Sequence, residues 1–291
     1  MQFLGGDMVR EFSLMNEKGA EFSLMDMEKY CLLTEPSGLG YSYNTTYTQM
    51  GNTFFTNLRK VEQGRINGIV NCLSYLNYRN LINYIESAEK LRFCYKLPIE
   101  NESKVYFKDV QIASVEKSEK DTDGVIKAPI TFDCLSLWYT NQEARYDMSP
   151  QDREIRWDFT WDSKFISYSS RRLEIVNNGH VDAPIEVAIS GEVENPEIEF
   201  YVDGKLYQTV SFAIRLEEFE KLLYGTKENE FYIYKENTDG TLTDLFNLDI
   251  IDFYNDNVIR IPKNRSCEIR LNADNDISYA RINVYIYYKA I

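Results

Sequence analysis

Apolar and polar positions alternate along most of this chain, which is the pattern of β-strands that are buried on one face. Phe12 and Leu14 alternate with polar residues, and their five-residue segment recurs unchanged at residues 21–25. Asn16 and Gly19 lie between the two copies. We therefore predict a β-hairpin that places its Phe and Leu side chains on one face. The same alternation predicts further strands at residues 65–73, 91–97, 105–115 and 125–139.

Helical spacing of apolar residues occurs in two places. Tyr78, Leu81, Ile82 and Ile85 recur at this spacing, and Asn77 is available as the N-cap, so we predict a helix there. A second, short helix is predicted from four apolar residues in the C-terminal half: Leu216, Phe219, Leu222 and Leu223.

The two halves of the chain differ in charge. Residues 1–145 contain 16 basic and 19 acidic residues, a net charge of −3, and the remainder contains 16 basic and 27 acidic residues, a net charge of −11. The change falls beside a polar stretch at residues 140–153, so we predict domains at residues 1–145 and 146–291. Short strands separated by turn signals such as Asn178-Gly179 and Asp239-Gly240 predict a β-sandwich for the second domain.

Composition supports a mainly β protein with a minor α contribution. Aromatic residues make up 14% of the chain, whereas Gly and Pro are scarce, which favours pleated, half-buried sheets over disordered chain. The net charge of −14 argues against unaided binding to nucleic acid or to an anionic membrane. No apolar run approaches the ~20 residues of a membrane span, and no secretory signal is visible, so we expect a soluble protein that folds in a cytoplasm.

The residues offer little for catalysis or for cofactor binding. His180 is the single histidine, so a Ser-His-Asp or Cys-His arrangement is not expected. The five cysteines are dispersed without a Cys-x-x-Cys pair, so we expect reduced, buried thiols, no disulfide and no zinc site. A calcium-loop-like run at residues 272–283 carries Ile277 where Gly is needed. With no glycine-rich phosphate loop either, we predict no catalytic site, no cofactor and no metal.

One aromatic stripe is a candidate binding face. Trp157, Phe159 and Trp161 alternate like one face of a strand, and such rings stack on sugars. A packed face is the more common origin of the same pattern, and a pair of catalytic carboxylates for glycoside hydrolysis cannot be recognised from spacing.

The order of features along the chain resembles the distal tail proteins of long-tailed bacteriophages. The N-terminal features are the Phe12-Ser13-Leu14 hairpin with Asn16 and Gly19, then Gly38-Leu39-Gly40, Gly51, the segment Tyr78 to Leu91, and Trp138. The C-terminal features are Asn178-Gly179, Pro184, Gly191 and Asn195-Pro196, which are similar to the galectin-like sandwich of that family.

The resemblance implies a structural virion protein and no enzyme. Members of the family form a hexameric ring at the tail tip, with N-terminal domains in the ring and galectin-like domains outside it. The partners implied are the tail tube protein, the tail-associated hub protein and a receptor-binding protein, with assembly in the bacterial host cytoplasm. The irregular stretch 33–52 is then expected to reach a neighbouring subunit, with Tyr41, Tyr43 and Tyr47 as contact residues.

Two other functions stay open at this stage. A carbohydrate-binding adhesion module of a phage baseplate would use the stripe from Trp157 to Trp161, and a glycosidase acting on cell walls would need two essential carboxylates.

Overall fold

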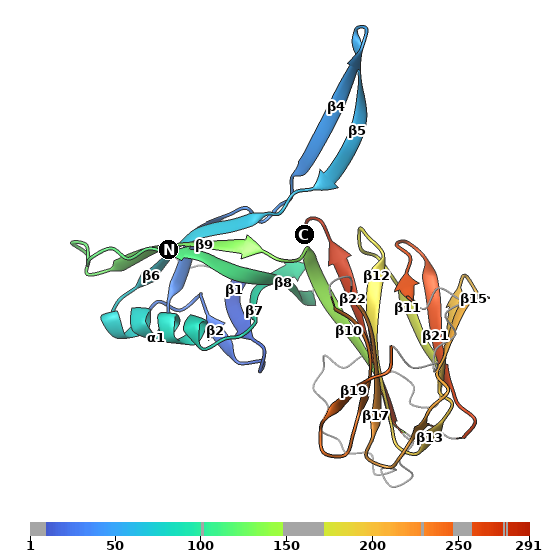
Figure 1. Ribbon diagram of the computed structural model, residues 1–291. Coiled ribbons are helices and arrows are strands. Elements are labelled where there is room, and N and C mark those ends of the chain that lie inside the picture. Colours follow the sequence, from blue (N-terminus) through green and yellow to red (C-terminus); the bar gives the residue numbers. More distant parts are fainter. Residues whose placement is uncertain are drawn as a thin grey trace. The chain divides into compact units, whose positions relative to one another are not determined.

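The computed structural model describes residues 10–99, 102–147, 172–227, 230–246, 258–275, 277 and 279–291. The chain forms two compact units (Figure 1): an N-terminal unit of Met1–Thr140 with Tyr288–Ile291, and a C-terminal unit of Asn141–Tyr287. The described residues form many strands and one helix, which confirms the mainly β class.

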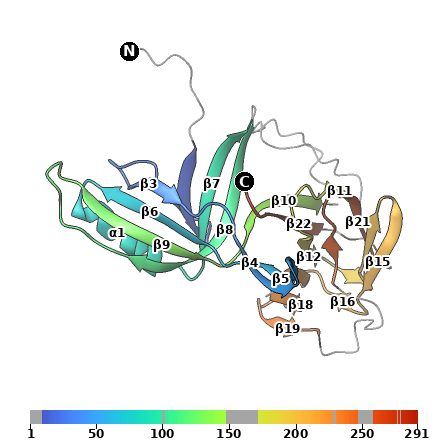
Figure 2. The same cartoon turned by 90° about the horizontal axis from the view of Figure 1, so that it is seen from above.

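An antiparallel sheet with the strand order β3-β6-β9-β8-β7-β1-β2 forms the body of the N-terminal unit. The elements of this unit are β1 (Glu11–Asn16), β2 (Glu21–Ser23), β3 (Leu32–Ser37), β4 (Tyr43–Met50), β5 (Thr53–Val61), β6 (Arg65–Cys72), α1 (Tyr75–Glu86), β7 (Leu91–Ile99), β8 (Glu102–Val115), β9 (Ile126–Cys134) and the start of β10 (Trp138–Asp147). Figures 1 and 2 together show α1 on one face of the sheet, beneath β6 and β9.

The predicted repeat hairpin is confirmed as β1 and β2. Leu14 pairs with Phe22 across the two strands, and Phe12, Leu14 and Phe22 are buried. The Asn16 side chain fixes the turn, because its Oδ1 accepts hydrogen bonds from the backbone N–H groups of Lys18 and Ala20 at 3.1 and 2.9 Å. The Asn side chain thus supplies an acceptor for backbone N–H groups of the turn, which is a common role of Asn in tight turns.

The first predicted helix is confirmed, but its start is different. Ser74 is the N-cap, and its Oγ accepts a hydrogen bond from the Asn77 N–H at 3.0 Å. Asn77 instead lies inside the first turn, where its Nδ2 donates to the carbonyl oxygens of Met27 and Glu28. Leu81 and Ile85 are buried, so the apolar spacing located the buried face of the helix.

Aromatic rings fill the core of the N-terminal unit. Phe93 contacts Phe132 and Trp138, with ring centroids 5.4 and 6.2 Å apart, and Phe12 stacks on Tyr95 at 4.6 Å. The Trp138 ring is fully buried, and its Nε1 donates to the Leu39 carbonyl oxygen at 2.8 Å. This hydrogen bond gives the buried indole N–H a partner, while the rest of the ring adds apolar surface to the core.

The C-terminal unit contains two main antiparallel sheets, which confirms the predicted β-sandwich. One has the order β19-β18-β17-β12-β22, and the other has the order β11-β21-β14-β15. Its strands are β11 (Arg172–Val176), β12 (Ala183–Ser190), β13 (Val193–Glu194), β14 (Glu197–Val202), β15 (Lys205–Ser211), β16 (Arg215–Leu216), β17 (Lys221–Lys227), β18 (Glu230–Glu236), β19 (Leu242–Asp244), β20 (Arg260–Ile261), β21 (Ser266–Asn272) and β22 (Tyr279–Tyr288).

Apolar side chains from both sheets meet between them. Phe212, which follows β15, contacts the ring of Tyr224 from β17 at a centroid distance of 5.9 Å, and both side chains are buried. Ile185 and Val187 alternate along β12 with more exposed residues, and both are buried as well. Two inner faces that interdigitate in this way define a sandwich core.

The second predicted helix is wrong. Leu216 lies in the two-residue strand β16, and Leu222 and Leu223 lie in β17, where Leu222 is buried and Leu223 is only partly covered. Phe219 is exposed in the connection between them. These residues are extended because β17 is hydrogen-bonded to a strand on each side, to β12 and to β18. Strand pairing of this kind overrides the helical preference that a short apolar spacing indicates.

Candidate interaction site

The β4–β5 hairpin, residues 43–61, projects from the N-terminal unit (Figure 1). Its register runs from the pair Tyr43 and Val61 at the base to the pair Met50 and Thr53 at the tip. Gly51 and Asn52 form the two-residue loop, and Gly51 has a φ of 61°, which glycine adopts without the penalty that a Cβ brings. The sequence predicted an irregular stretch from residue 33 to residue 52, whereas the structure forms β3 and β4 in this range, and β4 pairs with β5.

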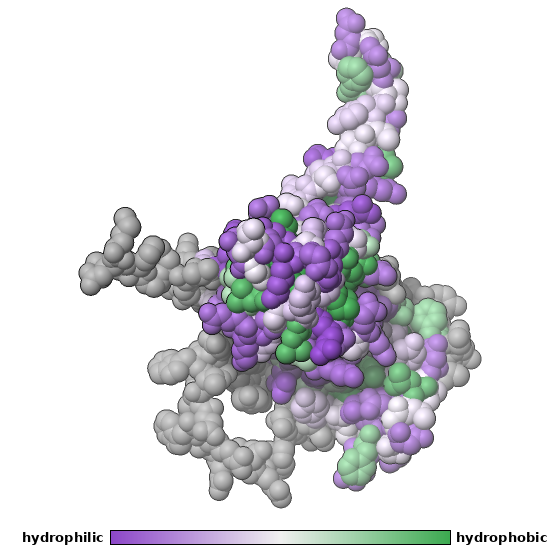
Figure 3. Space-filling view, turned by 90° about the vertical axis from the view of Figure 1, so that its left-hand side faces the viewer, coloured by the Kyte–Doolittle hydropathy of each residue, from purple (hydrophilic) through white to green (hydrophobic). Residues whose placement is uncertain are grey.

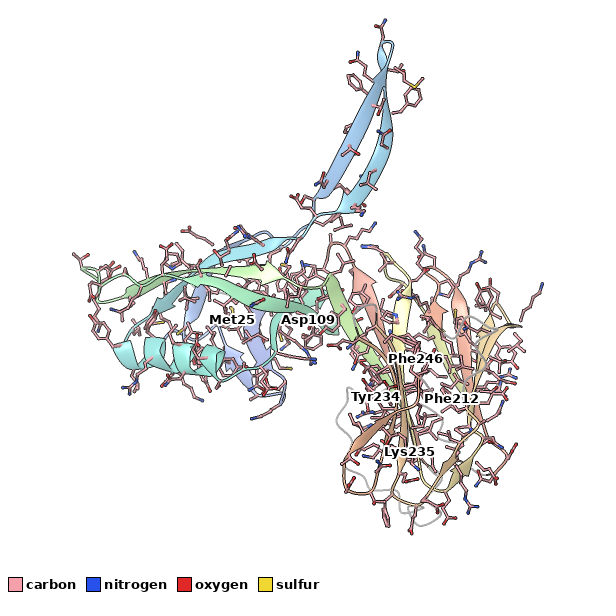
Figure 4. All side chains as sticks on the ribbon, viewed as in Figure 1. Met25, Asp109, Phe212, Tyr234, Lys235 and Phe246 are labelled. Carbon is pink, nitrogen blue, oxygen red and sulfur yellow. The ribbon has the colours of Figure 1, made fainter. Side chains whose placement is uncertain are left out.

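Large apolar side chains near the tip of the hairpin are exposed. Tyr47, Met50 and Phe54 keep 61%, 64% and 68% of their surface accessible, and Phe55 and Leu58 are also exposed. Figure 3 shows apolar residues interspersed with hydrophilic ones along the projecting hairpin, and Figure 4 shows its side chains extending from the ribbon into solvent.

These apolar groups lie on both faces of the hairpin. Cross-strand partners share a face, so the pair Gln49 and Phe54 places Phe54 on the same face as Tyr47. The pairs Thr48 with Phe55 and Met50 with Thr53 place Phe55 and Met50 on the opposite face. An isolated two-stranded hairpin is marginally stable in water, and neither face of this one has a core to cover it. Both faces are therefore suited to burial against a partner.

The base of the hairpin is held by Tyr43. The Arg59 guanidinium carbon lies 3.8 Å from the centroid of the Tyr43 ring, and the Tyr41 ring meets Tyr43 edge-on at 5.3 Å. Lys289 Nζ, near the end of the chain, donates to the Tyr43 hydroxyl at 3.0 Å. Ser42 Oγ donates to Glu62 Oε2 at 2.8 Å one step further down. These contacts tie the two strands of the hairpin together at its base and connect Tyr43 to Lys289.

The three tyrosines predicted as contact residues thus occupy different places. Tyr41 and Tyr43 are together at the base, where Tyr43 is partly covered and Tyr41 is 48% exposed, and Tyr47 lies apart from them towards the tip. Sequence reasoning missed the exposed residues of β5, Phe54, Phe55 and Leu58. The signal that could have found them is Gly51-Asn52, a two-residue hairpin loop flanked on both sides by Thr and aromatic residues.

The hairpin differs in charge from the rest of the chain. Residues 43–61 contain Arg59 and Lys60 and no acidic residue, so the segment carries +2 in a chain of net charge −14. A basic segment of this kind is attracted to an acidic surface.

The other predicted features do not form a second site among the described residues. Trp157, Phe159 and Trp161 lie outside the described residues. In the part of the chain that the structure describes, no group of three His, Cys, Asp or Glu side chains is arranged to hold a metal ion. The backbone N–H of His180 donates to the Tyr287 carbonyl oxygen at 2.8 Å within the sandwich. No helix of the described chain is long and apolar enough to cross a membrane.

Solved structures place the fold among proteins of phage baseplates. The chain matches a chain in the structure of the phage P2 baseplate in its activated conformation with Ca, at 18% identity and a TM-score of 0.66, covering 98% of this chain and 100% of that one. A second P2 baseplate structure, with Sr, matches at 17% identity and a TM-score of 0.65, with coverages of 97% and 100%. At these identities the matches establish the fold alone.

A family model then identifies the N-terminal unit more narrowly. Residues 11–135 match the N-terminal domain of the distal tail protein family, which confirms the resemblance drawn from the sequence. The crystal structure of the SPP1 Dit protein, described as a paradigm of the hub adsorption apparatus in phages that infect Gram-positive bacteria, matches at 10% identity and a TM-score of 0.54. That match covers 94% of this chain and 98% of the SPP1 chain. Curated protein sequences gave no match. Residues 11–135 are therefore similar to the N-terminal domain of distal tail proteins, and the fold of the whole chain is similar to that of the matched chains from phage baseplates.

Proposed function

We propose that this protein is the hub of a phage tail tip, in which six copies form a ring through the β4–β5 hairpin. The observation that carries the proposal is the set of exposed apolar side chains on both faces of that hairpin. In this role the protein acts structurally, without catalysis and without a cofactor. The ring joins the tail tube protein to the tail-associated hub protein and to a receptor-binding protein, and it is assembled in the host cytoplasm.

Ring closure follows from the kind of contact that a projecting hairpin makes. A hairpin inserted into a different surface of the next copy is a heterologous contact, and such contacts close into rings when the rotation between copies allows it. Each copy then supplies one hairpin and one receiving surface. Burial of Tyr47, Met50, Phe54 and Phe55 stabilises the contact, because a large apolar side chain contributes about 1.5–3 kcal/mol when it is removed from water.

The charge of the hairpin also supports a second copy of this chain as its partner. The hairpin carries Arg59 and Lys60 and no acidic residue, whereas the remainder of the chain is strongly acidic. A second copy therefore offers the complementary charge, which favours association of identical chains at low salt. The proposed ring should weaken as the salt concentration rises.

Light scattering across a concentration series tests the proposal. We expect a wild-type mass of about 205 kDa, six times the 34.2 kDa chain. The double variant Phe54→Ser/Phe55→Ser should reduce the mass to that of the monomer and leave the circular dichroism spectrum unchanged. Phe219→Ser is the matched control, because Phe219 is an aromatic side chain of the C-terminal unit that is 71% exposed.

Two results would contradict the hairpin contact. One is a hexamer that persists in the Phe54→Ser/Phe55→Ser variant, and the other is dissociation of the Phe219→Ser control to the same extent. A wild-type chain that remains a monomer at all concentrations would contradict self-assembly of the ring.

The carbohydrate-binding alternative remains a prediction from the sequence. It depends on Trp157, Phe159 and Trp161, and a glycan screen of the wild type against Trp161→Ala tests it. Binding that weakens in Trp161→Ala would favour this function, and a wild type that binds no glycan would remove it.

A further inference from the structure

Two cysteine thiols meet inside the N-terminal unit. Cys31 precedes β3 and Cys72 ends β6, and their Sγ atoms lie 2.8 Å apart. Both side chains have 0% of their surface exposed. The Cys31 thiol also faces the carbonyl oxygen of Asn77, 3.8 Å away in the first turn of α1.

The sheet itself brings these two residues together. Leu32 pairs with Asn71 and Leu33 pairs with Val70 across β3 and β6, so Cys31 and Cys72 occupy the next opposed positions of the same antiparallel ladder. Directly opposed residues of such a ladder have Cα atoms about 4.5–5.5 Å apart. Disulfides join Cα atoms about 4.4–6.8 Å apart. The backbone is therefore already spaced for a disulfide, and only the two side chains need to move.

We propose that Cys31 and Cys72 form an oxidisable dithiol site, which a small peroxide converts into an intramolecular disulfide. All five cysteines of the chain lie among the described residues, and all five are free thiols. The contact between Cys31 and Cys72 is the one thiol–thiol contact that these residues make. This site differs from the disulfide-free chemistry expected from the dispersed cysteines, because the fold places opposite each other two residues that are 41 positions apart.

The chemistry balances with hydrogen peroxide as the oxidant. The thiolate of one cysteine of the pair attacks one peroxide oxygen and breaks the O–O bond, which gives a sulfenic acid on that cysteine and releases hydroxide. The sulfur of the other cysteine then attacks the sulfenic sulfur, the S–S bond forms, and the sulfenic oxygen leaves as hydroxide. The two protons lost by the thiols combine with the two hydroxides. Two thiols and one peroxide therefore give one disulfide and two waters.

The hydrogen bond between the two thiols favours a thiolate within the pair. It lowers the pKa of one thiol, Cys72, and raises the pKa of the other, Cys31. By contrast, burial raises the pKa of Cys94 to about 12 and that of Cys267 to about 11. The thiolate is the reactive form, so the remaining cysteines are poorer competitors for the oxidant.

The position of the bond gives it a structural consequence, which rests on the proposed function. Residues 31 and 72 bracket the whole β4–β5 hairpin, so the disulfide closes a covalent loop that contains it. A disulfide restricts the unfolded chain within the loop that it closes. Thiols that stay reduced during assembly in a cytoplasm would form this bond when the particle reaches an oxidising exterior. The base from which the hairpin projects is then locked after assembly.

Peptide mapping of the purified full-length protein tests the site. The protein is treated with hydrogen peroxide, quenched, alkylated in denaturant and digested with trypsin. We expect peptides 30–59 and 66–79, which contain Cys31 and Cys72, to appear joined with a mass about 2 Da below their sum, and to separate after reduction. Alkylation should fall from five thiols to three. Cys267→Ser is the matched control, because it removes a buried thiol of the other unit and should leave the joined peptides unchanged.

The outcomes separate this proposal from the proposed ring. Five alkylated thiols after an excess of peroxide, or a joined pair that involves another cysteine, would refute the dithiol site, and neither result bears on the mass of the oligomer. The oxidised protein should also melt about 5–10 °C higher than the reduced protein. A joined pair without a higher Tm would refute the locking role.

Discussion

Lys108 is a buried cation whose removal should stabilise the protein. It lies on β8 opposite Phe93, it is 4% exposed, and its Nζ lies 4.8 Å from the centroid of the Trp138 ring. No carboxylate forms an ion pair with it among the described residues. Burial therefore lowers the pKa of Lys108, and an interaction with the Cys134 thiol opposes this in part.

The Lys108→Met variant keeps the apolar stem of the side chain and removes the charge. Burial of a polar group with incomplete compensation costs about 1–3 kcal/mol by protein mutational measurements, so we expect the variant to gain about 1–2 kcal/mol at pH 7. A gain of that size corresponds to a rise in Tm of roughly 3–8 °C. Most core substitutions destabilise, so the sign alone is a test.

The gain should depend on pH in a defined direction. Because the folded-state pKa of Lys108 lies below its ordinary value of 10.5, the unfolded chain binds more protons in the window between the two values. Wild-type stability therefore rises with pH through this window, and the advantage of Lys108→Met is full below the folded-state pKa and shrinks towards pH 10.5. Burial raises the pKa of Cys134, which acts in the opposite sense, so the comparison should be repeated in a Cys134→Ala background.

Urea unfolding followed by circular dichroism at several pH values measures this difference. Lys127→Met is the control, because the Lys127 side chain is 54% exposed and its ion pair with Asp121 contributes little. A Lys108→Met variant that is less stable than the wild type at pH 7, or a gain that is constant up to pH 10.5, would refute the reasoning.

Three further substitutions test the local structure by the same urea assay. Ser74→Ala removes the cap of α1 and should cost about 1 kcal/mol, and an unchanged stability would remove the capping role. Gly38→Ala should lower the free energy of unfolding by about 3 kcal/mol or more, because Gly38 has a φ of 77° and a Cβ there would lie 1.8 Å from the Arg65 carbonyl oxygen. Gly19→Ala is the control, because Gly19 has a similar φ but open space around it, and it should cost only about 1 kcal/mol. Gly225→Ala places a Cβ 2.5 Å from the Tyr232 ring and should cost about 1–3 kcal/mol, and Tyr232→Ala in the same chain should remove most of that cost if the contact is its cause.

The elements that were predicted correctly are those in which several local sequence features indicate the same structure. The β1–β2 hairpin was predictable because alternation and turn chemistry agree, and the buried face of α1 was predictable from Leu81 and Ile85. The cap was misplaced because Ser74 and Asn77 are both good N-cap residues, and only the fold shows that Asn77 is used by the backbone of Met27 and Glu28. The false helix at Leu216 to Leu223 came from four apolar residues, too short a window to exclude extended chain.

The candidate site was only half predictable, for a different physical reason. Residues 43–61 are rich in Thr and Asn and contact no core, so their sequence lacks the alternation that a buried face imposes. The turn at Gly51 and the packing of Tyr43 between Arg59 and Lys289 become visible only with the fold, since Lys289 comes from the far end of the chain.

The hairpin is also separable from the sheet that carries it. Ser37 pairs with Asn67 at the last contact between β3 and β6, and the chain between them leaves the sheet and returns to it. The paired strands therefore need nothing from the β4–β5 hairpin for their own hydrogen bonds, and the hairpin contributes no buried apolar side chain to the core. Stability does not explain its Tyr, Met and Phe residues, because in the isolated chain they leave apolar surface in water. The proposed ring contact would cover them, and we therefore expect that substitutions at the hairpin tip change assembly and leave the folding of the N-terminal unit unchanged.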